Sequence, residues 1–138
     1  VGYLDEQQRL WFCGRKAHRV VAGDTTLFTV RCEAIFNQHP DVARSALVGL
    51  GPRGSQQPLI VIEPRPGKIP NNRRAASRFR QELLELGSRH ELTKEITQVL
   101  FHPHLPVDFR HNAKILREQL AVWAASWQRQ ALPNGQYP

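Results

Sequence analysis

Methionine is absent from all 138 residues, and cysteine occurs only at Cys13 and Cys32. Because the chain starts at Val1 without an initiator methionine, we expect it to be a piece of a longer protein whose N-terminal neighbour is missing. Two cysteines are too few for a disulfide-based fold. The simplest interpretation is a pair of buried, reduced thiols in a cytoplasmic protein, with a disulfide as the less favoured alternative.

Long hydrophobic runs and export signals are also lacking. No apolar run approaches the roughly 20 residues of a membrane span, and the first residues do not have a signal-peptide pattern. With 41% hydrophobic residues, the chain is long enough for one domain with a modest core. We therefore predict a single compact domain with no membrane span.

Negative charge is scarce, because 19 lysines and arginines face 12 acidic residues, for a net charge of +7. Such an excess raises nucleic acid as a partner. Four of the arginines, at positions 73, 74, 78 and 80, fall near the start of one predicted helix. No helix-turn-helix, zinc-finger or ribonucleoprotein motif accompanies them. A basic module that binds nucleic acid or a protein partner stays open as an alternative function.

Metal-binding and hydrolase patterns are lacking as well. His102 and His104 are too close in sequence for a helical ligand pair, and only His111 and Asp108 lie near them. No Ser/His/Asp grouping has nucleophile-elbow spacing, and no glycine-rich phosphate loop occurs. We predict no metal site on this chain.

The first part of the chain is rich in short strand signals. Arg9–Cys13 and Arg19–Ala22 carry aromatic and β-branched residues and flank the polar segment Gly14–His18. They predict a strand pair joined across that segment. Gly23–Thr25 then has the composition of a turn.

A helix is expected from about Thr29 to Gln38, because the following His39-Pro40 cannot continue it. Val30, Ala34 and Phe36 are expected to face the core. Glu33 in this helix and His18 before it are candidates to contact a hinge near the start of the chain, but the sequence does not fix their role.

The middle of the chain predicts a small sheet. Arg44–Leu50 and Leu59–Glu63 are near-continuous apolar runs separated by a glycine- and proline-rich turn, which favours an antiparallel central pair. Gln98–Phe101 is a third strand candidate, and Glu91–Ile96 before it is a candidate short helix.

A longer amphipathic helix is predicted from about Asn72 to Leu86. Phe79, Leu83 and Leu86 share one face of it, and Gly87 is expected to end it.

The last ordered part combines an irregular polar loop with a patterned helix. Pro106–Lys114 reads PVDFRHNAK, and the next segment places an apolar stripe at Leu116, Leu120, Trp123 and Trp127. Asn112 is a candidate N-cap. Lys114 is then either a solvated cation of the first helical turn or a lysine aimed at an anionic group.

These patterns define an α+β fold. We expect a small antiparallel or mixed sheet of about three strands, covered by about three helices and preceded by a β-hairpin. Residues 1–22 would form a hinge and hairpin, 23–130 the main domain, and 131–138 a disordered tail.

Two segments resemble a known family. GYLDEQQRLWFCGRKAHRVV and TLFTVRCEAIFNQHPDVARSALVGLG resemble the hinge and the opening of the C-terminal domain of AMP-forming acyl-CoA synthetases, in the adenylate-forming superfamily. PVDFRHNAK lies where that family carries its lysine loop. The RHNAK segment and the ILREQLAVWAA after it are most similar to the olefin-biosynthesis β-lactone synthetases, which are fatty-acid–CoA ligase-like. The resemblance extends from Val1 to about Trp127.

The resemblance implies an ATP- and Mg²⁺-dependent fatty-acid-activating ligase, of which this chain is the mobile lid. A missing N-terminal AMP-binding domain would hold ATP, Mg²⁺ and the fatty acyl substrate, and other enzymes of an olefin pathway would be further partners. Lys114 would reach the acyl carboxylate and the α-phosphate, and Arg15 would contact the nucleotide ribose. The isolated chain would be inactive.

Two positions depart from the family pattern. Ala17 stands at the hinge position, where the family has Asp or Lys, although a small residue can still absorb the rotation of the lid. Asp24 falls where thioester-forming members have a glycine lining the pantetheine tunnel, although the adjacent Gly23 would restore that glycine in a shifted register. With Asp24 in the tunnel, CoA would be disfavoured, and a β-hydroxy acid would instead close to a β-lactone on its own adenylate.

Overall fold

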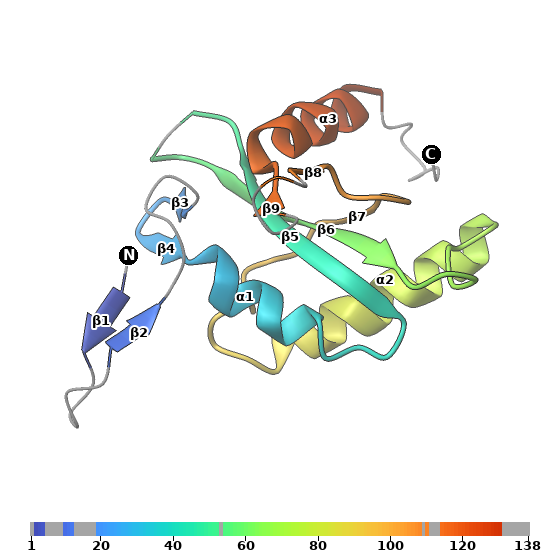
Figure 1. Ribbon diagram of the computed structural model, residues 1–138, viewed down its shortest axis with the longest axis horizontal. Coiled ribbons are helices and arrows are strands. Elements are labelled where there is room, and N and C mark those ends of the chain that lie inside the picture. Colours follow the sequence, from blue (N-terminus) through green and yellow to red (C-terminus); the bar gives the residue numbers. More distant parts are fainter. Residues whose placement is uncertain are drawn as a thin grey trace.

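The computed structural model describes residues 2–4, 10–12, 19–52, 54–108, 110 and 114–130, with side chains from residue 19 to residue 127 within those ranges. The predicted tail 131–138 therefore lies outside the described residues, as do Cys13 and His18. Along the chain (Figure 1) the elements are β1 (Gly2–Leu4), β2 (Leu10–Phe12), β3 (Val20–Ala22), β4 (Thr25–Leu27), α1 (Thr29–Phe36), β5 (Val42–Leu50), β6 (Gln57–Pro64), α2 (Arg73–Ser88), β7 (Val99–Phe101), β8 (Val107–Asp108), β9 (Lys114–Ile115) and α3 (Arg117–Gln130).

The core of the fold is a three-stranded sheet in the order β5-β6-β7. β5 and β6 are antiparallel, with Leu47 opposite Ile60, and β7 runs parallel to β6. Their apolar runs are buried on both faces, because helices cover the sheet from two sides (Figure 1). The predicted α+β fold with a small mixed sheet and three helices is confirmed.

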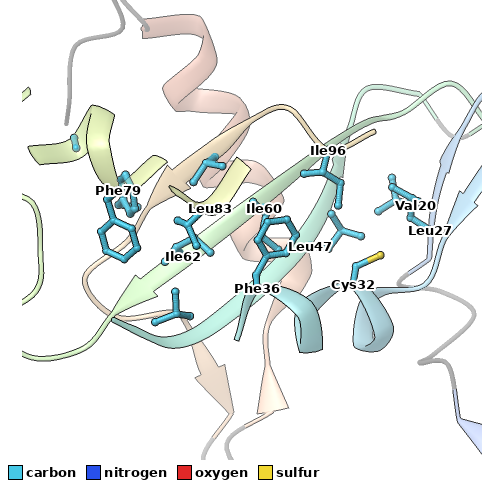
Figure 2. Close-up of a cluster of buried hydrophobic side chains, with 14 residues drawn as sticks. Val20, Leu27, Cys32, Phe36, Leu47, Ile60, Ile62, Phe79, Leu83 and Ile96 are labelled. Carbon is cyan, nitrogen blue, oxygen red and sulfur yellow. The ribbon is translucent and has the colours of Figure 1, made fainter. Parts of the chain in front are cut away.

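One face of the sheet packs against α1 and α2. Leu47 of β5 and Ile60 and Ile62 of β6 point to this face. They lie in one apolar cluster with Cys32 and Phe36 of α1 and with Phe79 and Leu83 of α2 (Figure 2). Cys32 is a free, buried thiol, as expected; burial raises its pKa to about 11, so it stays protonated and unreactive.

The opposite face packs against α3. The alternate residues of the strands, including Ala46, Val48 and Val61, form a smaller cluster with Leu120 and Ala124 of that helix. Both helix residues are fully buried. The two faces thus have separate cores, and β5 lies at the edge of the sheet between α1 and α3.

The predicted pairing of the first strands is wrong. β2 pairs with β1, whereas β3 pairs with β4, so the two predicted strands belong to different two-stranded ladders. Gly23 and Asp24 join β3 directly to β4, and Gly23 has a positive φ of 63° that favours glycine. This turn gives β3 a nearer partner than any strand before it.

The predicted core face of α1 is also wrong in part. Val30 and Ala34 are exposed, whereas Cys32, Ile35 and Phe36 are buried. The helix therefore uses a different side from the one that its small apolar residues indicated, because its position is set by docking on the sheet.

Two predictions around α2 need correction. Gly87 does not end the helix, which runs to Ser88; a Cβ at Gly87 would come 2.9 Å from Cζ of Phe36, so this glycine allows α1 and α2 to approach closely. Residues 91–95 form turns rather than a short helix. Thr93 is fully buried there and donates a hydrogen bond from Oγ1 to the carbonyl of Gly87 at 2.6 Å.

Among the described helices, none is both long and apolar enough to span a lipid bilayer.

Candidate functional site

Lys114 lies in the short strand β9 and not in the first turn of a helix. β9 pairs with β8, with Lys114 opposite Asp108 and Ile115 opposite Val107. The helix α3 starts only at Arg117, so the predicted first-turn position of Lys114 is wrong, and the candidate N-cap Asn112 lies outside the described residues. The lysine side chain is partly exposed. A strand position holds the lysine backbone in an extended conformation just ahead of a docked helix.

The helix after Lys114, α3, is held against the sheet by buried side chains. Leu120 and Ala124 are fully buried against the sheet. Trp123 and Trp127 are partly buried and meet edge to face, with ring centroids 6.1 Å apart. The predicted stripe is thus confirmed at Leu120 and in the covering tryptophans, while Leu116 lies just before the helix and donates its backbone N–H to the carbonyl of Pro106 at 2.8 Å.

The start of α3 is tied to α1 by a buried ion pair. Nη2 of Arg117 donates to both carboxylate oxygens of Glu33, at 2.5 Å to Oε1 and 2.7 Å to Oε2. The two side chains are only 14% and 9% exposed. Glu33 also accepts the backbone N–H of Leu47 on β5 at 2.8 Å. One carboxylate therefore connects α1, the edge strand β5 and α3.

This ion pair is largely buried from solvent. Burial raises the pKa of Glu33, and the hydrogen bond and charge of Arg117 and the N–H of Leu47 offset only part of that effect. Nε of Arg117 is buried without a hydrogen-bond partner among the described residues. The pair is thus an incompletely hydrogen-bonded contact at low dielectric.

A second carboxylate–arginine pair joins Arg44 on β5 to Glu63 on β6. Nε and Nη2 of Arg44 each donate to Glu63 at 2.9 Å, in a fork that matches the carboxylate. Glu63 also accepts the backbone N–H of Leu105 at 2.8 Å. Burial opposes ionisation of Glu63, but the bonds from Arg44 and Leu105 outweigh it and lower its pKa.

The other predicted site residues are separated. Gly23 and Asp24 are both exposed at the tip of the β3–β4 hairpin. Arg15 and Ala17 lie outside the described residues. A cleft of about 310 Å³ beside this hairpin is lined by polar and apolar residues alike, among them Thr25, Gln56, Leu27 and Pro58.

His102 and His104 lie between β7 and the loop that leads to Lys114. The rings of His102 and Trp123 meet edge to face, with their centroids 4.6 Å apart. Nδ1 of His102 accepts the backbone N–H of His104 at 3.0 Å. Burial lowers the pKa of His102. Within the part of the chain that the structure describes, no three His, Cys, Asp or Glu side chains come together as metal ligands.

Sequence reasoning did not find the Glu33–Arg117 pair. Its one local signal is a glutamate between Cys32 and Phe36, on what becomes the buried side of a short helix. A carboxylate at such a position requires a cationic partner, but the partner is 84 residues away in sequence.

The chain is similar in sequence to known proteins, although no family model matches it. Over 91% of its length the chain is similar to two olefin β-lactone synthetases, with 50% identity to the protein from Xanthomonas campestris pv. campestris and 44% identity to the protein from Stenotrophomonas maltophilia. In each case it spans only 22% of the relative.

Solved structures have the same fold. An anthranilate CoA ligase in complex with anthranoyl-AMP matches 95% of this chain at a TM-score of 0.71, with 20% identity, and the match covers 24% of that ligase. The resemblance to the C-terminal domain of the adenylate-forming acyl-CoA synthetases, predicted from the sequence motifs, is therefore confirmed.

Proposed function

We propose that this chain is the mobile lid domain of an ATP-dependent enzyme that activates a fatty acid as its acyl-adenylate. The observation that carries the proposal is Lys114, a partly exposed lysine on a short strand immediately before a docked helix, in a chain 50% identical to an olefin β-lactone synthetase. A neighbouring N-terminal AMP-binding domain would complete the enzyme, which would act in the cytoplasm. The 138-residue chain alone would be inactive.

In the first step the fatty acid carboxylate attacks the α-phosphate of ATP and pyrophosphate leaves. The ammonium of Lys114 is a compact cation that can stabilise the negative charge that develops on the carboxylate and phosphate oxygens. Mg²⁺ neutralises phosphate charge in such reactions, and the described residues of this chain include no carboxylate cluster to hold it. We therefore assign Mg²⁺ and most ATP contacts to the N-terminal domain, with Arg15 contributing a contact to the ribose.

For the second step we propose lactone closure within the substrate. The hydroxyl of a β-hydroxy acyl-adenylate attacks its own carbonyl carbon and loses its proton, the bond from the acyl carbon to the phosphate oxygen breaks, and AMP leaves. The exposed carboxylate of Asp24 at the hairpin tip supports this choice, because it would repel CoA phosphates if the hairpin turns toward the active site. The lid would rotate about Ala17 between the two steps.

Pyrophosphate exchange tests the first step. The full-length parent protein is incubated with ATP, labelled pyrophosphate and either β-hydroxy or simple fatty acids. We expect exchange with the wild type and a loss on the order of 10²- to 10³-fold in Lys114→Ala. Lys94→Ala, at an exposed lysine paired with Glu91, is the matched control and should exchange normally. Exchange at the wild-type rate in Lys114→Ala would remove this lysine from the mechanism.

Product analysis tests the second step. With a β-hydroxy fatty acid and CoA supplied together, we expect β-lactone and AMP as products. Asp24→Gly should increase acyl-CoA formation if the carboxylate is what disfavours CoA. Efficient acyl-CoA formation by the wild type from a simple fatty acid would overturn lactone closure while leaving acyl-adenylate formation in place.

The rival interpretation, a non-catalytic basic module, is not favoured by the similarity to ligases and synthetases. Salt-dependent, submicromolar binding to DNA or RNA would revive it.

A further inference from the structure

The buried ion pair Glu33–Arg117 connects α1 with the start of α3, close to Lys114. Arg117 is three residues after Lys114, at the first position of α3. Glu33 is on the opposite face of the sheet, and its carboxylate also accepts the N–H of Leu47 at the sheet edge. The pair therefore fixes the start of α3 relative to both the edge strand β5 and α1.

Local structure alone gives Lys114 little support. β8 and β9 form a ladder of only two residue pairs, and such a short hairpin is marginal in water. The hydrogen bond from Leu116 to Pro106 adds one connection. Ile115, the other residue of β9, packs against the apolar cluster from a partly buried position, and the fully buried Leu120 and Ala124 of α3 follow about a turn later. Arg117 lies between these apolar contacts and adds a directional one.

The electrostatics of the pair favour a geometric role over a stabilising one. Both groups are buried, the pKa of Glu33 is raised by that burial, and Nε of Arg117 has no partner among the described residues. A buried ion pair of this kind is often no more stable than an apolar pair of the same volume, because two charges lose their hydration. What an apolar pair cannot supply is a directional contact that sets the position of one backbone segment against another.

We propose that Glu33 and Arg117 are positioning residues for Lys114, and that their contact sets where the ammonium lies when the lid closes on the acyl-adenylate site. The inference rests on the proposed function of Lys114. Neither residue touches substrate, so the pair acts only through the backbone of β9 and the start of α3. Its loss should lower the turnover of the first step and leave ATP affinity almost unchanged.

The test separates position from stability in the full-length parent protein. Arg117→Met alone leaves a buried carboxylate, so the informative variant is Glu33→Gln/Arg117→Met, which removes both charges. Arg44→Met is the matched control, because it removes the arginine of the second carboxylate pair, within the β5–β6 ladder, and leaves the bond from Leu105 to Glu63 in place. Melting temperature and the kcat and KM of pyrophosphate exchange are measured for each variant.

We expect the double variant to melt within a few degrees of the wild type and to lose roughly 10- to 100-fold in kcat. The KM of the double variant for ATP should change by less than about twofold. Arg117→Lys, which keeps a cation opposite Glu33, should have a kcat between those of the double variant and the wild type. The Arg44→Met control should keep kcat within about twofold. A double variant with wild-type kcat would overturn the inference, because the pair would then be a structural contact only.

A second measurement decides the structural part without activity. In the 138-residue chain, the amide of Leu116 should lose protection from hydrogen exchange by about tenfold in the double variant, while the β5–β6 amides keep theirs. Unchanged protection at Leu116 would also overturn the inference. A wild type that fails to catalyse exchange with any fatty acid would instead defeat the proposed function, and the Leu116 amide would still report whether the pair positions this segment.

Discussion

The carboxylate–arginine pairs Arg44–Glu63 and Glu33–Arg117 connect parts of the chain that are separated by very different distances in sequence. Arg44 and Glu63 are opposite each other in the β5–β6 register and 19 residues apart in sequence. Glu33 and Arg117 are 84 residues apart and connect helices that cover opposite faces of the sheet. The first pair reinforces a ladder that backbone hydrogen bonds already define, whereas the second is part of what defines the relation between two layers.

Their electrostatics differ in the same way. Arg44 is 38% exposed and meets Glu63 as a two-bond fork, and the pKa of Glu63 is lowered. Arg117 is largely buried and meets Glu33 through a single nitrogen, and the pKa of Glu33 is raised. A partly hydrated pair with good geometry favours its charged state, while a dehydrated pair with incomplete geometry does not.

Removal of the arginine should affect the two pairs unequally. We expect Arg117→Met to lower the free energy of unfolding by about 3–5 kcal/mol at pH 7, because it leaves the Glu33 carboxylate buried without a counter-charge. Arg44→Met should lower it by only about 1 kcal/mol, since that arginine is partly solvated and Glu63 keeps the N–H of Leu105. Urea unfolding of the chain measures both. Equal losses would mean that the two pairs are not different in kind.

Neutralising both partners of each pair should show how much of the stability loss comes from the carboxylate that is left unpaired. We expect Glu33→Gln/Arg117→Met to regain about 2–3 kcal/mol over Arg117→Met alone, because the desolvated charge is gone and the glutamine oxygen can still accept the N–H of Leu47. Glu63→Gln/Arg44→Met should regain little, because Arg44→Met loses little. Comparison of the single and double variants by urea unfolding gives both differences. No recovery in the first double variant would assign the loss to packing of the arginine stem.

The same contrast explains what could be predicted from the sequence. β5, β6, α2 and β7 were predicted near their observed positions, because each carries a strong apolar pattern that packing only reinforces. The partners of β2 and β3 and the buried side of α1 were wrong. In those segments the elements are three to eight residues long, and tertiary docking decides the outcome.

The residues of the candidate site also differ in whether a local sequence pattern could predict them. Lys114 was found from the resemblance of PVDFRHNAK to a family loop, but its strand was not predicted, because β8 and β9 are too short to show any period. Glu33 and Arg117 were not paired, because no local pattern relates residues on opposite faces of a sheet. Arg15 and Ala17 stay predictions, since they lie outside the described residues.

A neutral contact at the same sheet edge tests whether charge is needed there. The hydroxyl of Ser45 on β5 lies 3.2 Å from the carbonyl oxygen of Glu33 and 2.8 Å from Oδ1 of Asn37, and it is buried. We expect Ser45→Ala to lower the free energy of unfolding by about 1 kcal/mol, the usual value for one neutral hydrogen bond. Urea unfolding measures the loss. A cost as large as that of Arg117→Met would show that the hydroxyl holds α1 against β5 as strongly as the ion pair does.

The smallest expected effect is the dependence of stability on pH, where the two carboxylates act in opposite directions. The pKa of Glu63 is lowered on folding from its ordinary value of 4.5, so its contribution to stability is present above pH 4.5 and is lost as the pH falls through its pKa in the folded state. The pKa of Glu33 is raised from 4.5, so its contribution is present below pH 4.5 and is lost as the pH rises through its pKa in the folded state.

Together the two groups should produce a shallow maximum of stability near pH 4.5, superimposed on the titration of the exposed carboxylates. We expect Glu33→Gln to remove the decline above that pH and Glu63→Gln to remove the decline below it, each relative to the wild type. Urea unfolding at closely spaced pH values between 3 and 7 measures both slopes. If Glu33→Gln keeps the decline above pH 4.5, the Glu33 carboxylate is as well stabilised as that of Glu63, and the electrostatic difference between the two pairs disappears.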